Sequence, residues 1–313
     1  MIRFVLRRLG YGVPVIFGVA VIVFATVKII PGDPVALLAG AGASEATKDE
    51  LRSRMGLDDN LVMQFWHWLT SALQGDLGTS IAQHRPALPL VADAFGNTLI
   101  LAAYATVLAL LIGLILGGVA GLRPRSIAGR VCSAISSISV SAPQYSVALL
   151  LIIYVALNTG MFPVSGMYGD GGGFVDLLWH GFLPALTSAL VPAGVIGRVF
   201  RASLLDALGM DFVEALRARG LSERRVLVHA VHNTLPSLLT MAGLQVGYLL
   251  GGVVFVETIF NWPGLGLLLF QSISARDLPV TQAGVLISAL SFVLINIVVD
   301  TAHALIDSRV RTS

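Results

Sequence analysis

Six long apolar blocks divide the chain, and each has roughly the length of a helix that crosses a bilayer. A transmembrane helix needs about 20 mostly apolar residues. The pattern therefore predicts an all-α membrane protein with six transmembrane helices. The blocks are Leu9–Ile30, Asn97–Leu122, Ile135–Leu157, His180–Gly197, Leu235–Val256 and Leu278–Val299.

The fourth block is short and contains two prolines, Pro184 and Pro192. Proline is tolerated in a membrane helix when neighbouring groups satisfy the backbone carbonyls that it leaves free. We therefore expect this helix to pack inside the bundle. The first block is longer than the roughly 7–15 apolar residues of a signal-peptide core, which favours an uncleaved first span.

The only long polar connection follows the first block. Pro31-Gly32-Asp33-Pro34 should end the first helix, because proline cannot continue it and restricts the residue before it. Thr47 and Glu50 have the spacing of a capping box for a short helix. A second helix with one apolar stripe is predicted by a repeat at i+4. That repeat is Leu61, Phe65, Leu69 and Leu73, with Trp66 and Trp68 suited to a membrane interface.

These patterns divide the chain into three regions. Residues 1–30 are the N-terminus and first span, residues 31–96 a small helical segment outside the cytoplasm, and residues 97–313 a five-span core. The core contains a charged loop, residues 198–232. Its central part, Arg198–Arg225, holds six arginines and four acids between two uncharged stretches.

The charged loop itself reads as two short helices. Asp211 is a suitable N-cap for a helix over 212–219, and Gly220 can take the left-handed position that closes it. The apolar side of this helix, which we take as Phe212, Ala215 and Leu216, should find cover on the bundle. Ser222 can cap the next helix. A charged helix between two spans is placed to dock onto a soluble partner.

Composition supports a chain that lies mostly in lipid. Only 12% of the 313 residues are charged and 56% are hydrophobic, against roughly 25% charged in soluble domains. The single cysteine, Cys132, excludes an intrachain disulfide and suggests a packed thiol. The histidines lack metal-ligand spacing, so we predict no metal site and no catalytic residues.

Orientation follows from the distribution of Lys and Arg. If the N-terminus is cytoplasmic, fourteen of the 20 basic residues lie on the inside and five on the outside, with Lys28 at the boundary. Cytoplasmic connections are enriched in Lys and Arg. The asymmetry predicts that both termini and the charged loop are cytoplasmic.

Residues 214–220, Glu-Ala-Leu-Arg-Ala-Arg-Gly, resemble the Glu-Ala-Ala-x-x-x-Gly loop of permease subunits of binding-protein-dependent ABC importers. Leu216 replaces the second alanine of that loop. Further motifs resemble the dipeptide/oligopeptide/nickel branch of these permeases and extend the resemblance from end to end. They include residues 31–34 (PGDP), 75–78 (GDLG), 162–166 (FPVSG), 201–203 (RAS), 218–222 (ARGLS), 232–236 (HNTLP), 260–266 (FNWPGLG), Asn296 with Asp300, and 309–311 (RVR).

The resemblance implies a multi-pass subunit of a bacterial inner membrane. It would pair with a second permease subunit and two ATPase subunits, and an extracytoplasmic solute-binding protein would deliver cargo. The ATPase-docking residues implied are Asp211, Phe212, Glu214, Ala215, Leu216, Arg217, Arg219 and Gly220. The chain lacks the Gly-x-x-x-x-Gly-Lys-Ser/Thr loop that cradles phosphates. We therefore expect no enzyme activity in the chain itself, with ATP and Mg²⁺ bound on the partners, and no nucleic acid.

Glu257 is the first acid after 31 uncharged residues, at the outer end of the fifth block. It could hold the following turn by accepting backbone N–H bonds, or contact the delivering protein. With Trp262, Pro263 and Gly264 it forms our candidate for a binding-protein contact or outer gate. Polar residues in the apolar blocks, among them Asn97 and Thr98, favour hydrogen bonds between helices.

Two other classes of function stay open. An ion- or proton-driven carrier would work without ATPase partners, but such carriers usually need an ionisable residue in mid-span, and the charges here lie at block ends or in loops. A structural assembly subunit without its own pathway is the third possibility. The cargo is undetermined: dipeptides, oligopeptides, glutathione and metal chelates are all compatible with the sequence.

Overall fold

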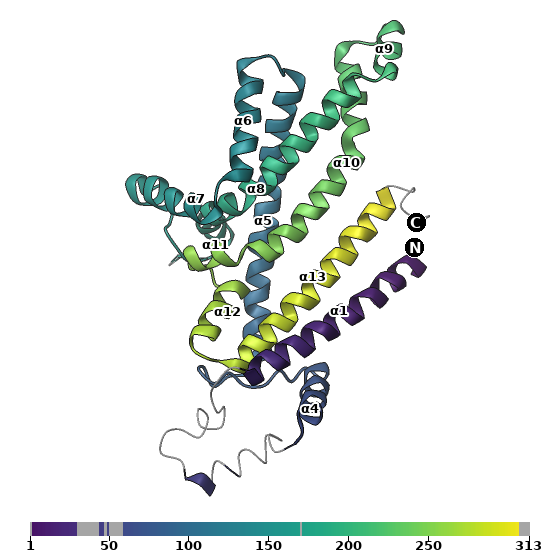
Figure 1. Cartoon of the computed structure of the whole chain (residues 1–313). Coiled ribbons are helices and arrows are strands. Elements are labelled where there is room, and N and C mark those ends of the chain that lie inside the picture. Colours follow the sequence, from purple (N-terminus) through teal and green to yellow (C-terminus); the bar gives the residue numbers. More distant parts are fainter. Residues whose placement is uncertain (1, 30–43, 47–48, 50–58, 170, 307–313) are drawn as a thin grey trace. The chain divides into compact units, whose positions relative to one another are not determined.

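A computed structural model describes residues 2–29, 44–46, 49, 59–169 and 171–306 (Figure 1). The residues predicted as a turn (31–34) and a capping box (Thr47 and Glu50) lie outside that part. Regular structure in the described part is helical, apart from an isolated bridge between Thr79 and Pro86. The helices are α1 (Ile2–Ile29), α4 (Leu61–Leu73), α5 (Ala87–Leu122), α6 (Ile127–Ser141), α7 (Gln144–Leu151), the π-helix η1 (Ile152–Leu157), α8 (Phe174–Leu208), α9 (Asp211–Ala218), α10 (Glu223–Gly252), α11 (Val254–Ile259), α12 (Leu265–Ser274) and α13 (Leu278–Ile306).

Four helices in the described part are long and apolar enough to cross a membrane, and a fifth span results if one bent pair is counted. The four segments are Arg7–Thr26, Ala87–Leu122, Phe174–Leu208 and Leu278–Val299, and the pair is Ile127–Ser141 with Gln144–Leu157. The structure thus confirms an all-helical, multi-span chain. The count of six stays a prediction.

The third apolar block is not one straight helix, contrary to the sequence prediction. It breaks between α6 and α7, whose axes differ by 109°. Ala142 has the extended conformation (φ −73°, ψ 129°) that the ring of a following proline favours, and Pro143 lies at the N-cap of α7. A proline within the sequence of an apolar block therefore marks a change of direction here.

The fifth block also differs from its prediction. Most of it belongs to α10, which begins in the charged loop and ends at Gly252, and a short break at Val253 separates it from α11. The block's last residues therefore belong to another helix. Although α10 is 30 residues long, it is not among the helices that are both long and apolar enough to cross a membrane.

The chain forms two compact units. Within the described residues, the first comprises residues 97–169, 171–263 and 295–306, and the second comprises residues 2–29, 44–46, 49, 59–96 and 264–294. Helices α5 and α13 each contribute residues to both units.

In the first unit, small residues let three helices approach closely. A Cβ added to Gly117 on α5 would lie 2.6 Å from the carbonyl oxygen of Gly197 on α8. One added to Gly194 would lie 2.5 Å from the carbonyl oxygen of Ser136 on α6. Close approach at small residues is typical of membrane helix packing. In helix α8, the fourth predicted span, 61% of the residues in the most apolar stretch are buried, which confirms that it packs inside the bundle.

In the second unit, α4 packs on α1 through aromatic rings. The ring centroids of Phe17 and Phe65 lie 5.8 Å apart, and those of Phe24 and Trp68 lie 6.0 Å apart. Lys28 donates a hydrogen bond to the side chain of Gln64. Residues 61–73 thus form a helix, as predicted, and its aromatic side chains pack on the C-terminal half of α1.

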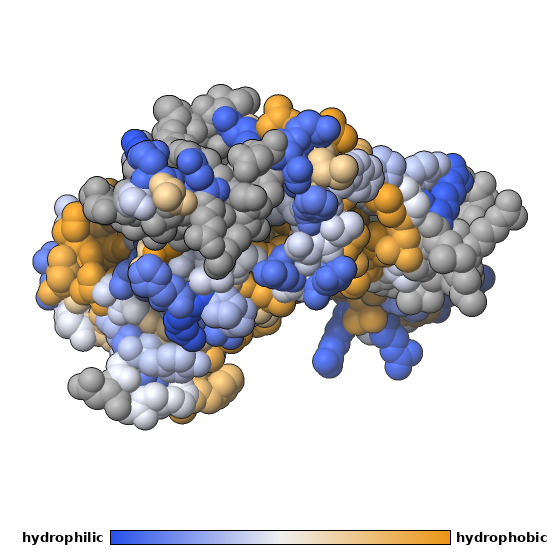
Figure 2. Space-filling model, turned by 90° about the horizontal axis from the view of Figure 1, so that it is seen from below, coloured by the Kyte–Doolittle hydropathy of each residue, from blue (hydrophilic) through white to orange (hydrophobic). Residues whose placement is uncertain are grey.

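Many large apolar side chains remain exposed, as the orange hydrophobic areas of Figure 2 show. Ile115 on α5 is 63% exposed and Val298 on α13 is 65% exposed. Soluble monomers rarely expose large contiguous apolar patches. Surfaces of this kind suit contact with lipid or with other membrane subunits.

Candidate partner-docking site

The charged loop contains a short helix, α9, that packs on α10. Its buried residue is Val213, which is 1% exposed, and Phe212 and Leu216 are half-buried beside it. The amide of Asn233 on α10 contacts the sulfur of Met210, the N-cap of α9, at 3.5 Å. Helix α9 is therefore held on one side by the rest of its own unit.

The opposite side of α9 is open to solvent. Asp211, Glu214, Ala215 and Ala218 are exposed and follow the spacing of one helical face. The apolar side was predicted to include Ala215, and this was wrong: Val213 takes its place in the contact with the bundle. Ala215 instead contributes a small apolar position to the exposed face between acidic neighbours.

The N-terminus of α9 also differs from its prediction. Asp211 is the first residue of the helix and Met210 is the N-cap, without a hydrogen bond from its side chain. Asp211 and Glu214 nevertheless lie in the first turn, where carboxylates interact favourably with the helix dipole. At the other end, Arg217 lies in the last turn, where a cation is favourable.

The C-terminus of α9 closes as predicted. Gly220 has φ +76°, in the left-handed region. The amide of Gly220 donates to the carbonyl of Arg217 at 2.9 Å, and that of Leu221 donates to the carbonyl of Leu216 at 3.2 Å. These two bonds make a Schellman motif, which satisfies carbonyls that the last helical turn leaves free. The turn fixes the direction in which the chain leaves α9.

An ion pair crosses this turn and links α9 to α10. The guanidinium of Arg217 donates to both carboxylate oxygens of Glu223, at 2.8 and 3.2 Å. The hydrogen bond from Arg217 lowers the pKa of Glu223, and the same bond raises the pKa of Arg217. Ser222 is the N-cap of α10 as predicted, although its side chain makes no capping hydrogen bond. Arg219 is exposed at the C-cap of α9.

The second candidate site lies around Glu257 in α11. Its side chain is fully buried, and its Oε1 accepts a hydrogen bond from the hydroxyl of Thr98 on α5 at 2.7 Å. Its backbone carbonyl accepts from the amide of Trp262 at 2.8 Å. Glu257 therefore supports the turn that follows α11.

The indole of Trp262 is 1% exposed, and its Nε1 donates to the carbonyl of Asn97 at 3.0 Å. The Asn97 amide donates in turn to the carbonyl of Pro263 at 2.9 Å. This reciprocal pair ties the turn at residues 260–263 to α5, which confirms that Asn97 and Thr98 serve as links between helices. Asn261, with φ +48°, and Pro263 are exposed on the turn.

Gly264 belongs to the other compact unit, where it is the N-cap of α12 in an extended conformation. It is buried, and its carbonyl accepts from the amide of Leu268 at 3.0 Å. Its role there is that of a helix start. The predicted roles of Glu257, Trp262, Pro263 and Gly264 in gating or binding-protein contact stay predictions.

A buried carboxylate that sequence reasoning missed lies in the second unit. Asp277 is 2% exposed and accepts hydrogen bonds from the hydroxyl of Ser80 and from the amides of Ile81 and Ala82. The position just before Leu278-Pro279 suits an acid that precedes a helix. Nothing local in the sequence indicates that its partners lie almost 200 residues earlier.

Comparisons with known proteins agree with this architecture. Residues 109–312 match the family described as the binding-protein-dependent transport system inner membrane component, and residues 1–102 match the N-terminal part of such membrane components. The glutathione transport system permease protein GsiC of Escherichia coli O6:H1 (strain CFT073) is 38% identical over 312 residues, covering 99% of both chains. GsiC of Salmonella typhi is 39% identical with the same coverage.

Two solved structures share the fold. An amino acid ABC transporter crystallised with histidines superposes with a TM-score of 0.53 at 18% identity, covering 71% of this chain and 94% of that one. An inward-facing form of the MetNI methionine ABC transporter gives a TM-score of 0.53 at 21% identity, covering 71% and 95%.

The multi-span helical fold and these matches define a membrane transport subunit. The chain belongs to the family of binding-protein-dependent transport system inner membrane components. It is an ABC importer permease subunit, a multi-pass protein of the inner membrane, and resembles the peptide and glutathione branch of that family.

Proposed function

We propose that this permease subunit imports small peptides such as glutathione with energy from ATP. The cargo class rests on the relatives above, which are named as glutathione permeases and match the chain from end to end. Dipeptides, oligopeptides and metal chelates remain the competing cargoes. Direct uptake of labelled glutathione and of labelled dipeptides by the reconstituted complex tests this choice.

Helix α9 is the element through which we propose the ATPase acts. The observation that carries this proposal is its two-sided character: Val213 faces the bundle while Glu214 and Ala215 are exposed. A helix of eight residues is marginal alone, and the Gly220 turn and the Arg217–Glu223 pair hold it on α10. A helix so held can transmit a push from a partner to the bundle.

The complete complex would contain this chain, a second permease subunit, two ATPase subunits and an extracytoplasmic binding protein. ATP and Mg²⁺ would be bound by the ATPase subunits, and this chain would bind neither nucleotide nor metal. Both termini and α9 would be cytoplasmic. The turn carrying Asn261 and Pro263 would then face outward, where it could serve as a gate or a binding-protein contact.

Replacing Glu214 by Arg tests the docking role. The substitution reverses a charge on the exposed face of α9 without touching the buried face, so we expect normal membrane levels. Uptake and substrate-stimulated ATP hydrolysis should be lost, or the ATPase subunits should no longer co-purify. Asp206→Arg is a matched control, because Asp206 is an exposed acid near the end of α8 but outside α9. If Glu214→Arg keeps wild-type coupling, α9 is only a connecting helix.

The competing proposal is an ion-gradient carrier, and Glu257 is the feature on which it would rest. Buried acids in membrane segments commonly mark proton or ion pathways. In this structure Glu257 is instead engaged with Thr98 and lies beside a backbone turn. Vesicles that contain the whole complex and internal ATP decide between the two. An uncoupler should leave uptake intact, and a collapse of uptake would favour the carrier.

A further inference from the structure

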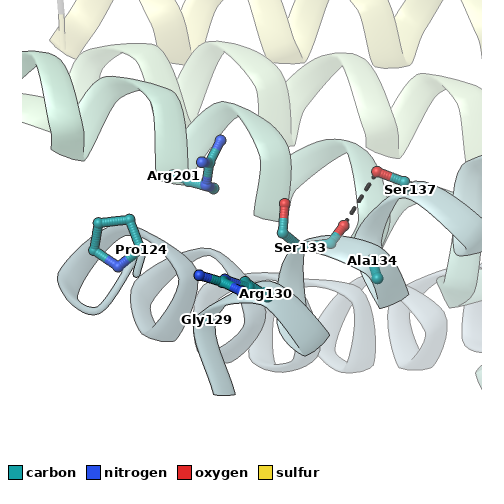
Figure 3. Close-up of a pocket in the computed structure, with 7 residues that line it drawn as sticks. All are labelled: Pro124, Gly129, Arg130, Ser133, Ala134, Ser137 and Arg201. Carbon is teal, nitrogen blue, oxygen red and sulfur yellow. Dashed lines mark hydrogen bonds between the residues drawn. The ribbon is translucent and has the colours of Figure 1, made fainter. Parts of the chain in front are cut away.

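A basic pocket opens between the α5–α6 connection, α6 and α8 (Figure 3), and its lining residues belong to neither candidate site. Its volume is about 260 Å³, smaller than the roughly 300–1,000 Å³ of sites for drug-sized ligands. It therefore suits a small group rather than a whole cargo molecule. The lining residues are Pro124, Gly129, Arg130, Ser133, Ala134, Ser137 and Arg201.

Two arginines from different helices give the pocket its charge. Arg130 comes from the first turn of α6 and Arg201 from the C-terminal part of α8. Neither side chain makes a hydrogen bond or ion pair with another residue in the described part of the chain, and no acidic residue lines the pocket. Guanidinium groups bind phosphate through paired N–H donors. The arrangement favours an anion between them.

The start of α6 adds to this positive character. Its first residues follow Ser126, whose hydroxyl accepts from the amide of Gly129 at 3.0 Å. A helix N-terminus carries a partial positive charge. A Cβ at Gly129 would lie 2.1 Å from the carbonyl oxygen of Arg123, so the tight turn that shapes the pocket admits only glycine there.

An exposed apolar stripe runs along α6 beside the pocket. Its residues recur at i+4 and i+3, so they share one face of the helix, and Ala134 of the pocket lies next to that face. The exposed fractions are 81% for Ile127, 49% for Val131, 42% for Ile135 and 65% for Ile138. Inorganic phosphate would make no contact with this apolar surface, whereas the acyl chain of a lipid can cover it.

We propose that this pocket binds the phosphate group of an anionic membrane phospholipid, with acyl chains along the α6 stripe. Basic pockets between membrane helices on the cytoplasmic side are suited to anionic headgroups. Lipid occupying this site would bridge α6 and α8, which pack closely at Gly194 and Ser136. None of the lining residues belongs to α9 or to the turn after Glu257, so the test of this site does not depend on the proposed function.

The test is retention of phosphatidylglycerol by the purified complex in nanodiscs of mixed phosphatidylglycerol and phosphatidylcholine. Binding is measured by mass spectrometry of intact protein–lipid assemblies. For each basic residue in direct contact with an anionic headgroup we take about 1 kcal/mol of attraction, or about fivefold in affinity. We expect about a fivefold loss for Arg130→Gln or Arg201→Gln and about a thirtyfold loss for the double variant.

Arg125→Gln is the matched control, because Arg125 lies in the same connection, is exposed and does not line the pocket. It should keep most of the bound phosphatidylglycerol. An equal loss in this control, or no loss in the double variant, would overturn the proposal. Competition by inorganic phosphate in the same mixed nanodiscs separates the two sources: displacement of bound phosphatidylglycerol by free phosphate at matched concentration would overturn the assignment to lipid.

A second measurement holds even if the glutamine variants do not assemble. A photoactivatable phosphatidylglycerol, with the reactive group in its acyl chain, is cross-linked to the wild-type complex and the adducts are mapped by peptide mass spectrometry. Adducts within residues 127–138 are expected. Adducts confined to other helices would contradict the proposal.

Discussion

Gly220 illustrates a residue required by backbone conformation rather than by crowding. A Cβ at this position would meet no atom within 4 Å, yet φ is +76°. Residues with a Cβ are disfavoured in the left-handed region by about 1–2 kcal/mol, with asparagine among the best tolerated. The pattern of acid, short helix and glycine was enough to predict this turn from sequence.

Substitution at Gly220 should therefore follow conformational preference and not size alone. Gly220→Val should destabilise the α9–α10 turn by about 1–2 kcal/mol and reduce coupled ATP hydrolysis, because the β-branched side chain strains φ. Gly220→Asn should retain most of the coupling, because asparagine tolerates the left-handed region although its side chain is large. Equal loss of coupling in both variants would show that the exposed space around Gly220 is filled by a partner instead.

Thr98 offers a test of the buried contact with Glu257. Thr98→Val preserves shape but removes one donor to a buried carboxylate, and a hydrogen bond to a charged group contributes about 1.5–3 kcal/mol. We expect a lower thermal unfolding midpoint for the purified permease in nanodiscs.

Thr106→Val is the control for that experiment. Thr106 lies on the same helix and is half-buried, but its hydroxyl donates to the carbonyl of Ala102 and not to a carboxylate. Its substitution should shift the midpoint far less. Equal shifts in the two variants would mean that the Thr98–Glu257 bond contributes nothing beyond an ordinary threonine contact.

At the scale of elements, α9 shows both the reach and the limit of sequence patterns. Its existence and its glycine end were predictable because caps and turns depend on neighbouring residues. Its buried side was not, because Phe212, Val213 and Ala215 are all apolar and the choice among them depends on how α9 packs on α10. The structure selects Val213.

The break between α6 and α7 belongs to the same scale. Pro143 was visible in the sequence, but a proline inside an apolar block can either kink a span or redirect the chain. Pro184 and Pro192 lie within one continuous helix, α8, while Pro143 starts a new one at 109°. Which outcome occurs depends on the helices that pack around the proline, and the residues next to it in sequence do not reveal those contacts.

The Arg217–Glu223 pair leads to a prediction about pH. The folded pKa of Glu223 is lowered from its ordinary value of 4.5. The pair's stabilisation is therefore fully present above that value and is lost as pH falls through the lowered folded pKa. Because both side chains are exposed, the effect should be small.

The rate of coupled ATP hydrolysis should therefore show no step from titration of this pair between pH 6 and 8. Glu223→Gln removes the titrating group while keeping its shape. Its pH profile should overlay that of the wild type in this range. A step present in the wild type and absent from Glu223→Gln would contradict the direction of the pKa shift.

At the scale of the whole molecule, sequence reasoning reached the family through motifs spread along the chain, and the matches to residues 1–102 and 109–312 support it. The long-range contacts were beyond its reach. Asp277 bonds to the loop at Ser80, and Arg130 shares a pocket with Arg201. Each joins segments whose separation in sequence leaves no local signal.

Membrane orientation is the prediction that ties these levels together. Fourteen basic residues against five favour cytoplasmic termini. The shared pocket adds an independent constraint, because Arg130 and Arg201 line it together. The connection at residues 123–126 and the loop at 198–225 should therefore lie on the same side of the membrane.

Single-cysteine labelling in a Cys132→Ala background tests this arrangement. Cysteines at Asp59 and Gln83, both exposed, should react with a membrane-impermeant maleimide in intact cells. Cysteines at Arg125 and Arg217, also exposed, should react only after the membrane is permeabilised. Labelling of the Arg217 site in intact cells would overturn both the orientation and the docking role of α9. Labelling of the Arg125 site alone would contradict the shared pocket, because residues lining one cavity cannot belong to loops on opposite sides of the bilayer.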